Sequence, residues 1–145
     1  MVNADLKLSN PARDMQPLHV RSLVDTGAMN LCVPEHVALQ LGLKELYKRE
    51  VTIADGSTRL VPYVGPVAIE FENRGCVTGA LVLGDEVLLG VVPMEDMDVL
   101  VSPATQTLVV NPANPNIARA IVKQGRRHRR NRGRACPNGL AALRA

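Results

Sequence analysis

The stretch that decides the fold is SLVDTGA, which runs from Ser22 to Ala28. An apolar segment ends in Asp25, and the glycine at position 27 allows the chain to turn sharply there. Aspartate and glycine are ordinary turn residues, so the tripeptide DTG says little by itself, and Asp25 could simply cap local N–H groups. Its meaning depends on the segments that flank it.

Two features after the tripeptide supply this context. The apolar run Leu31–Val33 precedes Pro34, which suits the first turn of a helix, and Gly42 suits its end. We therefore expect the one main helix over about residues 34–42. Much further along the chain, a second apolar pair is closed by a glycine in Leu88-Leu89-Gly90.

The other segments up to about residue 112 show the patterns of β-strands. Residues 4–9 alternate apolar and polar side chains, as a half-buried strand does. Asp55-Gly56 lies between two β-prone segments and is a strong signal for a hairpin turn. Residues 99–110 predict a last hairpin, and Pro93–Asp98 is compatible with a single helical turn. The pattern favours a mainly β domain.

Composition limits the class of protein. The chain has 145 residues with no Trp, one Phe and two Tyr, so its core must be small and aliphatic. A small core makes oligomerisation a plausible source of further burial. Three scattered cysteines without a CxxC motif indicate neither a disulfide framework nor a four-cysteine zinc site. We expect reduced thiols in a soluble, cytoplasmic protein without a signal peptide or membrane span.

Charge divides the chain into two parts. Nine Lys and Arg and fourteen Asp and Glu precede Lys123, a net charge of −5, whereas the remainder carries eight basic residues and no acid. We expect residues 1–112 to form the domain and 113–145 to be a linker and an unstructured basic tail. The preferred interpretation of the basic run Arg126–Arg134 is a solvated tail. The alternative is a weak contact with nucleic acid or an anionic surface.

The chain resembles the retropepsin-like, retroviral-type aspartic proteases. Three segments carry this resemblance: SLVDTGA, the helix after it, and Leu88-Leu89-Gly90. The resemblance is strongest to the small bacterial members, which share this helix and an Ala-Asp-Gly turn like residues 54–56. It covers about residues 4–112. It implies a closed or partly barrel-like half-domain that forms a twofold homodimer. The implied activity is that of an aspartic endopeptidase, in which Asp25 of each subunit activates one water and no metal or cofactor takes part.

The resemblance also implies a role for each matched residue. Asp25 would be catalytic, and Thr26, Gly27 and Ala28 would form the active-site turn and support the dimer. The hairpin tip would be a flap over an extended peptide substrate, formed by Ile53, Ala54, Asp55, Gly56 and Ser57. Leu88, Leu89 and Gly90 would line the loop beneath the two carboxylates.

Departures from the family pattern and rival functions complete the interpretation. Viral members often brace the dimer with acidic residues after DTGA and an arginine after the late glycine, where this chain has Met29-Asn30 and Val91. Cys32 and His36 could supply two metal ligands from one helix face, but no third or fourth ligand is evident. No GxSxG elbow or Gly-rich phosphate loop is present. A non-catalytic peptide-binding or scaffold module on the same fold, with a nucleic-acid-attracted tail, is the alternative function.

Overall fold

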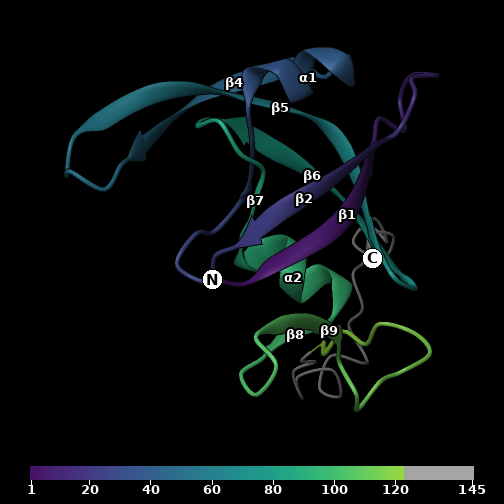
Figure 1. The fold of residues 1–145 in the computed structure, drawn as a ribbon. Helices are drawn as coiled ribbons and strands as arrows, with labels where there is room; N and C mark the ends of the chain where they lie inside the picture. Colours follow the sequence, from purple (N-terminus) through teal and green to yellow (C-terminus); the bar gives the residue numbers. More distant parts are fainter. Residues whose placement is uncertain (123–145) are drawn as a thin grey trace, which may run out of the picture.

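The computed structural model describes residues 1–122 (Figure 1). The elements follow one another in the order β1 (Asn3–Ser9), β2 (Leu18–Val24), β3 (Leu31–Val33), α1 (Glu35–Gln40), β4 (Lys44–Thr52), β5 (Thr58–Phe71), β6 (Arg74–Val82), β7 (Leu88–Leu89), α2 (Val91–Met97), β8 (Val99–Ser102) and β9 (Thr107–Val110). The domain is mainly β, as the sequence predicts. In this part of the chain, no helix is long and apolar enough to cross a membrane.

Most of the strands close into a barrel. The sheet has the order β1-β2-β7-β3-β6-β5-β4, and β1 also pairs with β5, so the first six strands of this order form a closed ring. Closure removes the free sheet edges that would otherwise be exposed. Strand β4 lies outside the ring on β5, and Figure 1 shows the β4–β5 hairpin reaching away from the barrel.

Strand β7 is inserted between two strands that are neighbours in the sequence. It runs parallel to β2, with Leu23 opposite Leu88, and antiparallel to β3, with Cys32 opposite the same leucine. The short strand therefore joins the two arms of the loop that contains the DTG tripeptide. This arrangement brings residues 88–90 next to residues 24–30, although they are far apart in the sequence.

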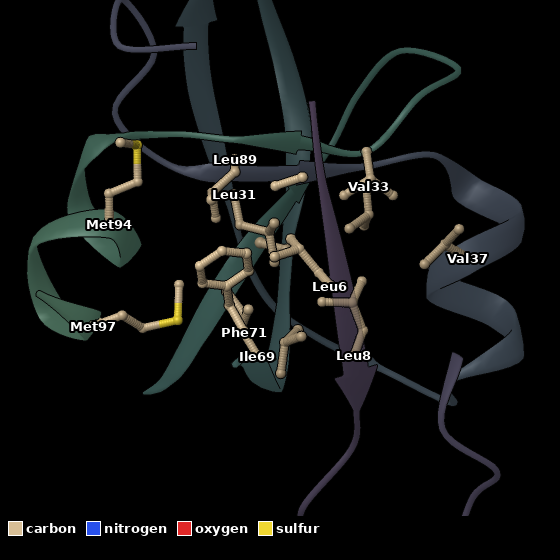
Figure 2. Close-up of a cluster of buried hydrophobic side chains, with 14 of the residues drawn as sticks. Leu6, Leu8, Leu31, Val33, Val37, Ile69, Phe71, Leu89, Met94 and Met97 are labelled. Atoms are coloured by element: carbon tan, nitrogen blue, oxygen red, sulfur yellow. The ribbon is translucent and has the colours of Figure 1, made fainter. Parts of the chain in front are cut away.

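The core fills the barrel and the space under its two helices. Figure 2 shows Leu6 and Leu8 of β1 beside Leu31 and Val33 of β3, with Val37 of α1 on one side and the methionines of α2 on the other. Because side chains alternate along a strand, the inward positions of β1 are all apolar and buried. Phe71 is the sole Phe in the chain, so aliphatic side chains and methionine supply most of the packing.

The helices differ from the prediction in extent and in number. Helix α1 covers Glu35–Gln40, with Pro34 at its N-cap and Gly42 in a left-handed conformation (φ +63°) just after its end. Helix α2 covers Val91–Met97 and begins before the single turn expected from Pro93, so α1 is not the only main helix. Pro93 falls in the first turn of α2, where a helix needs no N–H from it.

Residues beyond the predicted domain boundary also contact the barrel. The β8–β9 hairpin lies where the sequence places it, with Val99 opposite Val110. Asp98 then accepts hydrogen bonds from the side chains of Asn111 and Asn114 and from the backbone N–H of Arg119. The predicted basic run 126–134 lies outside the described residues.

Candidate active site

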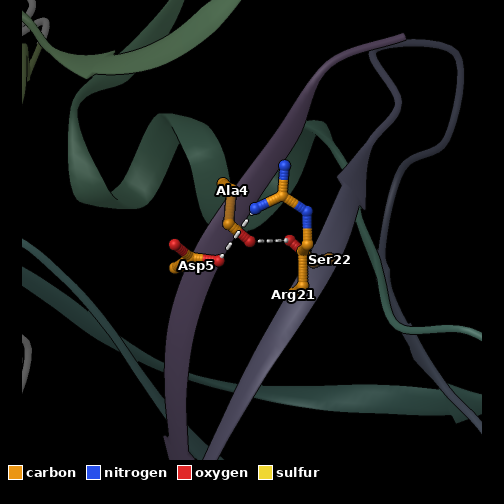
Figure 3. Close-up of polar contacts among 4 residues, drawn as sticks. All are labelled: Ala4, Asp5, Arg21 and Ser22. Carbon is orange, nitrogen blue, oxygen red and sulfur yellow. Dashed lines mark hydrogen bonds and ion pairs between the residues drawn. The ribbon is translucent and has the colours of Figure 1, made fainter.

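Strand β2, which ends just before Asp25, is held in register by a buried hydroxyl. Ser22 is fully buried, and its Oγ donates a hydrogen bond of 3.1 Å to the carbonyl oxygen of Ala4 on β1 (Figure 3). The neighbouring ion pair between Arg21 and Asp5 is 3.4 Å long and exposed, so it adds little. The buried hydrogen bond thus fixes the strand three residues before the aspartate.

The backbone of Asp25 is bonded to strand β7. Its N–H donates to the carbonyl oxygen of Leu89 at 3.0 Å, and the N–H of Leu23 donates to Val87 at 2.9 Å. The N–H of Ala28 then donates to the carbonyl oxygen of Asp25 at 3.1 Å, which closes the turn. The aspartate therefore sits on a turn whose two sides are held by the barrel.

The Asp25 carboxylate has one local partner and faces solvent. Its Oδ1 accepts a hydrogen bond of 2.8 Å from the N–H of Gly27, and a Cβ on that glycine would come within 3.2 Å of the same oxygen. Asp25, Thr26 and Gly27 are all exposed. The local cap orients the carboxylate and leaves it open to another molecule.

Gly90 allows the loop after the tripeptide to pass close to the end of β7. A Cβ at this position would lie 2.4 Å from the carbonyl oxygen of Asn30 and 2.8 Å from that of Ala28, which are backbone atoms. The N–H of Val91 donates to Ala28, and that of Val92 donates to Met29, both at 2.8 Å. The predicted Leu-Leu-Gly segment therefore lies directly against the aspartate turn.

The two leucines of this segment face opposite sides of the sheet. Leu89 is fully buried in the main core. Leu88 packs with a second, smaller cluster built on Cys32, Val61 and Leu81. Asp25 follows Leu23 by two residues, and Leu23 is the register partner of Leu88, so the carboxylate lies on the side of this second cluster.

Cys32 belongs to the site, although sequence analysis did not assign it there. Burial first, and the charge of Asp25 second, raise the pKa of the Cys32 thiol. Cys32 lies on β3, whereas His36 lies on α1, so they do not share the helix face from which the sequence would have them supply two metal ligands. Cys32 lies at the site because β3 pairs with β7, and no local sequence pattern predicts this long-range pairing.

The predicted hairpin tip joins β4 to β5. The N–H of Ile53 donates to Ser57 at 2.9 Å, and the N–H of Gly56 donates to Ile53 at 2.9 Å. The hydroxyl and the backbone N–H of Ser57 both donate to Asp55, and they lower the pKa of its carboxyl. Gly56 has φ +88°, a conformation that favours glycine.

Two residues of this hairpin, one near its tip and one near its base, pack beside the site. Val51 of β4 and Tyr63 of β5 pack against the cluster that contains Cys32. The tip residues Ala54–Ser57 are exposed. The hairpin therefore stands on the same side of the barrel as the carboxylate and has an exposed tip.

Comparison with known proteins bears on the fold. The sequence matches no protein-family model and no curated protein. Among solved structures, the retroviral protease-like domain of Ddi1 from Leishmania major aligns with a TM-score of 0.51 and 12% identity, over 77% of this chain and 90% of that one. Simian foamy virus (mac) protease aligns with a TM-score of 0.44 and 15% identity, over 62% and 90%. The barrel, the inserted strand β7 and the Ddi1 likeness together give this chain a retropepsin-like fold.

Proposed function

We propose that the chain is an aspartic endopeptidase that acts as a twofold homodimer with one Asp25 from each subunit. The observation that carries the proposal is the DTG turn, held by β7 and presented to solvent at the surface of a retropepsin-like barrel. The chain has one DTG and no second Asp-Thr-Gly or Asp-Ser-Gly. One subunit thus supplies half of a pair, and a twofold axis through the turn supplies the other half.

The chemistry needs two carboxylates that hold one proton between them. Two like charges about 3 Å apart cannot both ionise cheaply, so one Asp25 is ionised and the other is protonated. The ionised carboxylate takes a proton from water while the protonated one gives its proton to the carbonyl oxygen. The water oxygen bonds to the carbonyl carbon and forms a gem-diol.

Collapse of the gem-diol returns the pair to its starting state. One carboxylate takes a hydroxyl proton from the diol, and the other gives its proton to the nitrogen of the leaving amine as the C–N bond breaks. The products are a carboxylic acid and an amine, and the pair again holds one proton. Thr26 would bond to the partner subunit, and the hairpin tip Ile53–Ser57 would close over the extended peptide as a flap.

Exposed apolar side chains beside the turn support association of two copies. The side chain of Met29 is 63% exposed and that of Val92 is 42% exposed, and the backbones of these residues are hydrogen-bonded to each other. They stand close to the positions where viral members carry a charged brace. An apolar contact between subunits would take the place of that brace, and burial of both pairs would stabilise the dimer.

Three other properties belong to the same proposal. We place the chain with the small bacterial members of the family and in the cytoplasm. We keep the catalytic domain at residues 1–112 and assign 113–145 to the linker and basic tail.

The decisive experiment compares the wild type with Asp25→Asn in hydrolysis of peptides. Loss of the carboxylate should lower kcat by at least about 100-fold, because general acid–base catalysis of this kind contributes that much or more. Asp14→Asn, at an exposed turn away from the site, is the matched control and should leave activity unchanged. Full activity of the Asp25→Asn protein, or silencing of the wild type by a chelator, would remove Asp25 from its assigned role. Absence of cleavage by the wild type would leave the non-catalytic peptide-binding role.

The dependence of activity on pH provides a second test. Cleavage should follow a bell with its maximum in mildly acidic solution, because activity requires a singly protonated pair. Above the maximum, both carboxylates ionise and repel each other, so Asp25→Asn should dimerise at least as tightly as the wild type at neutral pH. Analytical ultracentrifugation measures this, and a wild type that stays monomeric while cleaving peptides would contradict the shared site.

A further inference from the structure

A small pocket lies on the face of the sheet that carries Asp25. Leu23, Cys32, Leu83 and Leu88 form its floor, and its volume is about 250 Å³. Leu23 and Cys32 are both register partners of Leu88, so these three side chains stand on one face. Alternation along β2 places the carboxylate of Asp25 on the same side. The pocket therefore adjoins the candidate catalytic turn.

The pKa of the Cys32 thiol agrees with a position of the pocket near Asp25. The charge of Asp25 contributes, after burial, to raising the pKa of Cys32. A side chain in the pocket would thus lie beside the bond that the proposed carboxylate pair cleaves.

The rim of the pocket carries two negative charges. It is formed by Gly84, Asp85 and Glu86, and the glycine has φ +81°, a conformation that favours glycine. Both acidic residues are exposed, and the pocket lining contains no Lys, Arg or His. Within residues 1–122, neither carboxylate takes part in an ion pair. The pocket thus joins an apolar floor to an anionic rim.

We propose that this pocket selects a lysine or arginine side chain of the substrate, at a position next to the bond that is cleaved. The inference rests on the proposed peptidase function and names its substrate class. The methylene groups of such a side chain would lie on the apolar floor while its cation approaches Asp85 and Glu86. A long apolar side chain gains the floor contact alone, and an acidic side chain is repelled by the rim.

The first measurement maps cleavage in a mixture of denatured proteins. Full-length wild-type protein is used, and mass spectrometry identifies the residues on both sides of each cleaved bond. Lysine and arginine should be enriched at one of these two positions. Synthetic peptides that differ only there, with lysine, norleucine or glutamate, then measure the preference, since norleucine keeps the stem of lysine without its charge.

The expected preference is moderate and depends on salt. At low ionic strength, kcat/KM for the lysine peptide should exceed that for the norleucine peptide by about 3- to 10-fold, as two exposed carboxylates allow. The glutamate peptide should be the poorest of the three. The ratio should shrink at high salt, because the Debye length falls to about 3 Å at 1 M. Equal rates for lysine and norleucine at low salt would overturn the inference.

A charge-matched pair of variants assigns the preference to the rim. Asp85→Asn with Glu86→Gln should bring the lysine-to-norleucine ratio close to one. Glu95→Gln with Asp96→Asn removes the same charge from an exposed position on α2, outside the pocket lining, and should leave the ratio as in the wild type. If the preference for lysine survives in the Asp85→Asn, Glu86→Gln protein, or falls equally in both double variants, the rim does not cause the preference.

Peptide binding separates this inference from the proposed function. Fluorescence anisotropy with the full-length Asp25→Asn protein measures affinity for labelled lysine and norleucine peptides without cleavage. The peptidase assignment fails and the pocket assignment stands if the wild type cleaves no peptide while the Asp25→Asn protein still binds the lysine peptide more tightly than the norleucine peptide. This difference in affinity must disappear when Asp85 and Glu86 are also replaced. If the wild type cleaves peptides without a basic preference, the pocket assignment fails alone.

Discussion

At the scale of single residues, close backbone approach decides the geometry of the candidate site. Asp25 takes its position from backbone bonds to β7, and Gly90 leaves the space in which residues 28–30 cross the end of that strand. Both requirements concern main-chain atoms, which cannot move aside as the end of a flexible side chain can. The site is therefore more sensitive to a small change at the glycine than to a change in an exposed side chain.

Gly90→Ala should destabilise the domain by about 1–3 kcal/mol, the usual cost of overpacking a tight site. Its methyl group would lie 2.4 Å from the carbonyl oxygen of Asn30, so the turn after Asp25 must shift. Urea unfolding at one protein concentration measures the loss. Gly75→Ala is the control, since its methyl group meets the nearest atom at an ordinary 3.4 Å. Equal stability of the two variants would contradict this account.

At the scale of elements, the segment after β9 is attached to the end of α2. Asp98 has φ +58° and ends the helix, and its carboxylate accepts three hydrogen bonds from residues 111–119. The side chain of Asn73 and the buried guanidinium of Arg74 donate to the carbonyl oxygens of Pro115 and Asn114. The β5–β6 turn and the end of α2 thus hold this segment between them.

Asp98→Asn should remove stability that depends on pH. The side chain of Asn111, the N–H of Arg119 and the side chain of Asn114 lower the pKa of Asp98 because they bond its ionised form. A lowered pKa stabilises the folded state above the ordinary pKa of aspartate, and this contribution is lost as pH falls through the lower value. Unfolding midpoints should therefore differ between wild type and variant at pH 7 and converge in acid.

Asp96→Asn is the control for this measurement, because the residue is exposed and lies on the same helix. Its midpoint should follow that of the wild type across the same pH range. A gap between wild type and Asp98→Asn that stays constant into acid would show that the carboxylate acts through its shape rather than its charge.

At the scale of the whole molecule, charge is unevenly distributed along the chain. Residues 1–122 carry a net charge of −5 and include the entire barrel, whereas residues 123–145 carry +8. The sequence pI near 9.0 is thus a property of the tail. The opposite net charges of residues 1–122 and 123–145 favour different classes of partner for the two segments.

Deletion of Lys123–Ala145 should change the free energy of unfolding by less than about 1 kcal/mol, as for other terminal segments that add little to a core. Any binding to nucleic acid should disappear with the tail and, in the full chain, fall steeply with added salt. Replacing the arginines within residues 126–134 by glutamine keeps the length and removes the charge. Loss of the dimer or a large loss of stability in the deletion would show that the tail is structural.

The sequence by itself determined the class of fold and the local features of the candidate site. The apolar strand into DTG, the proline-started helix and the Asp55-Gly56 hairpin all depend on neighbouring residues, whose patterns and turn chemistry are visible in one chain. The prediction of a mainly β, retropepsin-like domain is confirmed for this reason. Asp25 and Leu88-Leu89-Gly90 are far apart in the sequence. Both could still be assigned to the candidate site, because each segment resembles a family motif by itself.

Only the tertiary structure decided how distant segments meet. Placement of β7 between β2 and β3 is a long-range pairing, and it is this pairing that puts Cys32 and Leu88 beside the aspartate and closes the barrel. Helix α2 also exceeded its prediction, because Val91 and Val92 favour strands locally while packing of its methionines into the core favours the helix. Local propensity is weak compared with burial of a whole face, so these features followed from the assembled core.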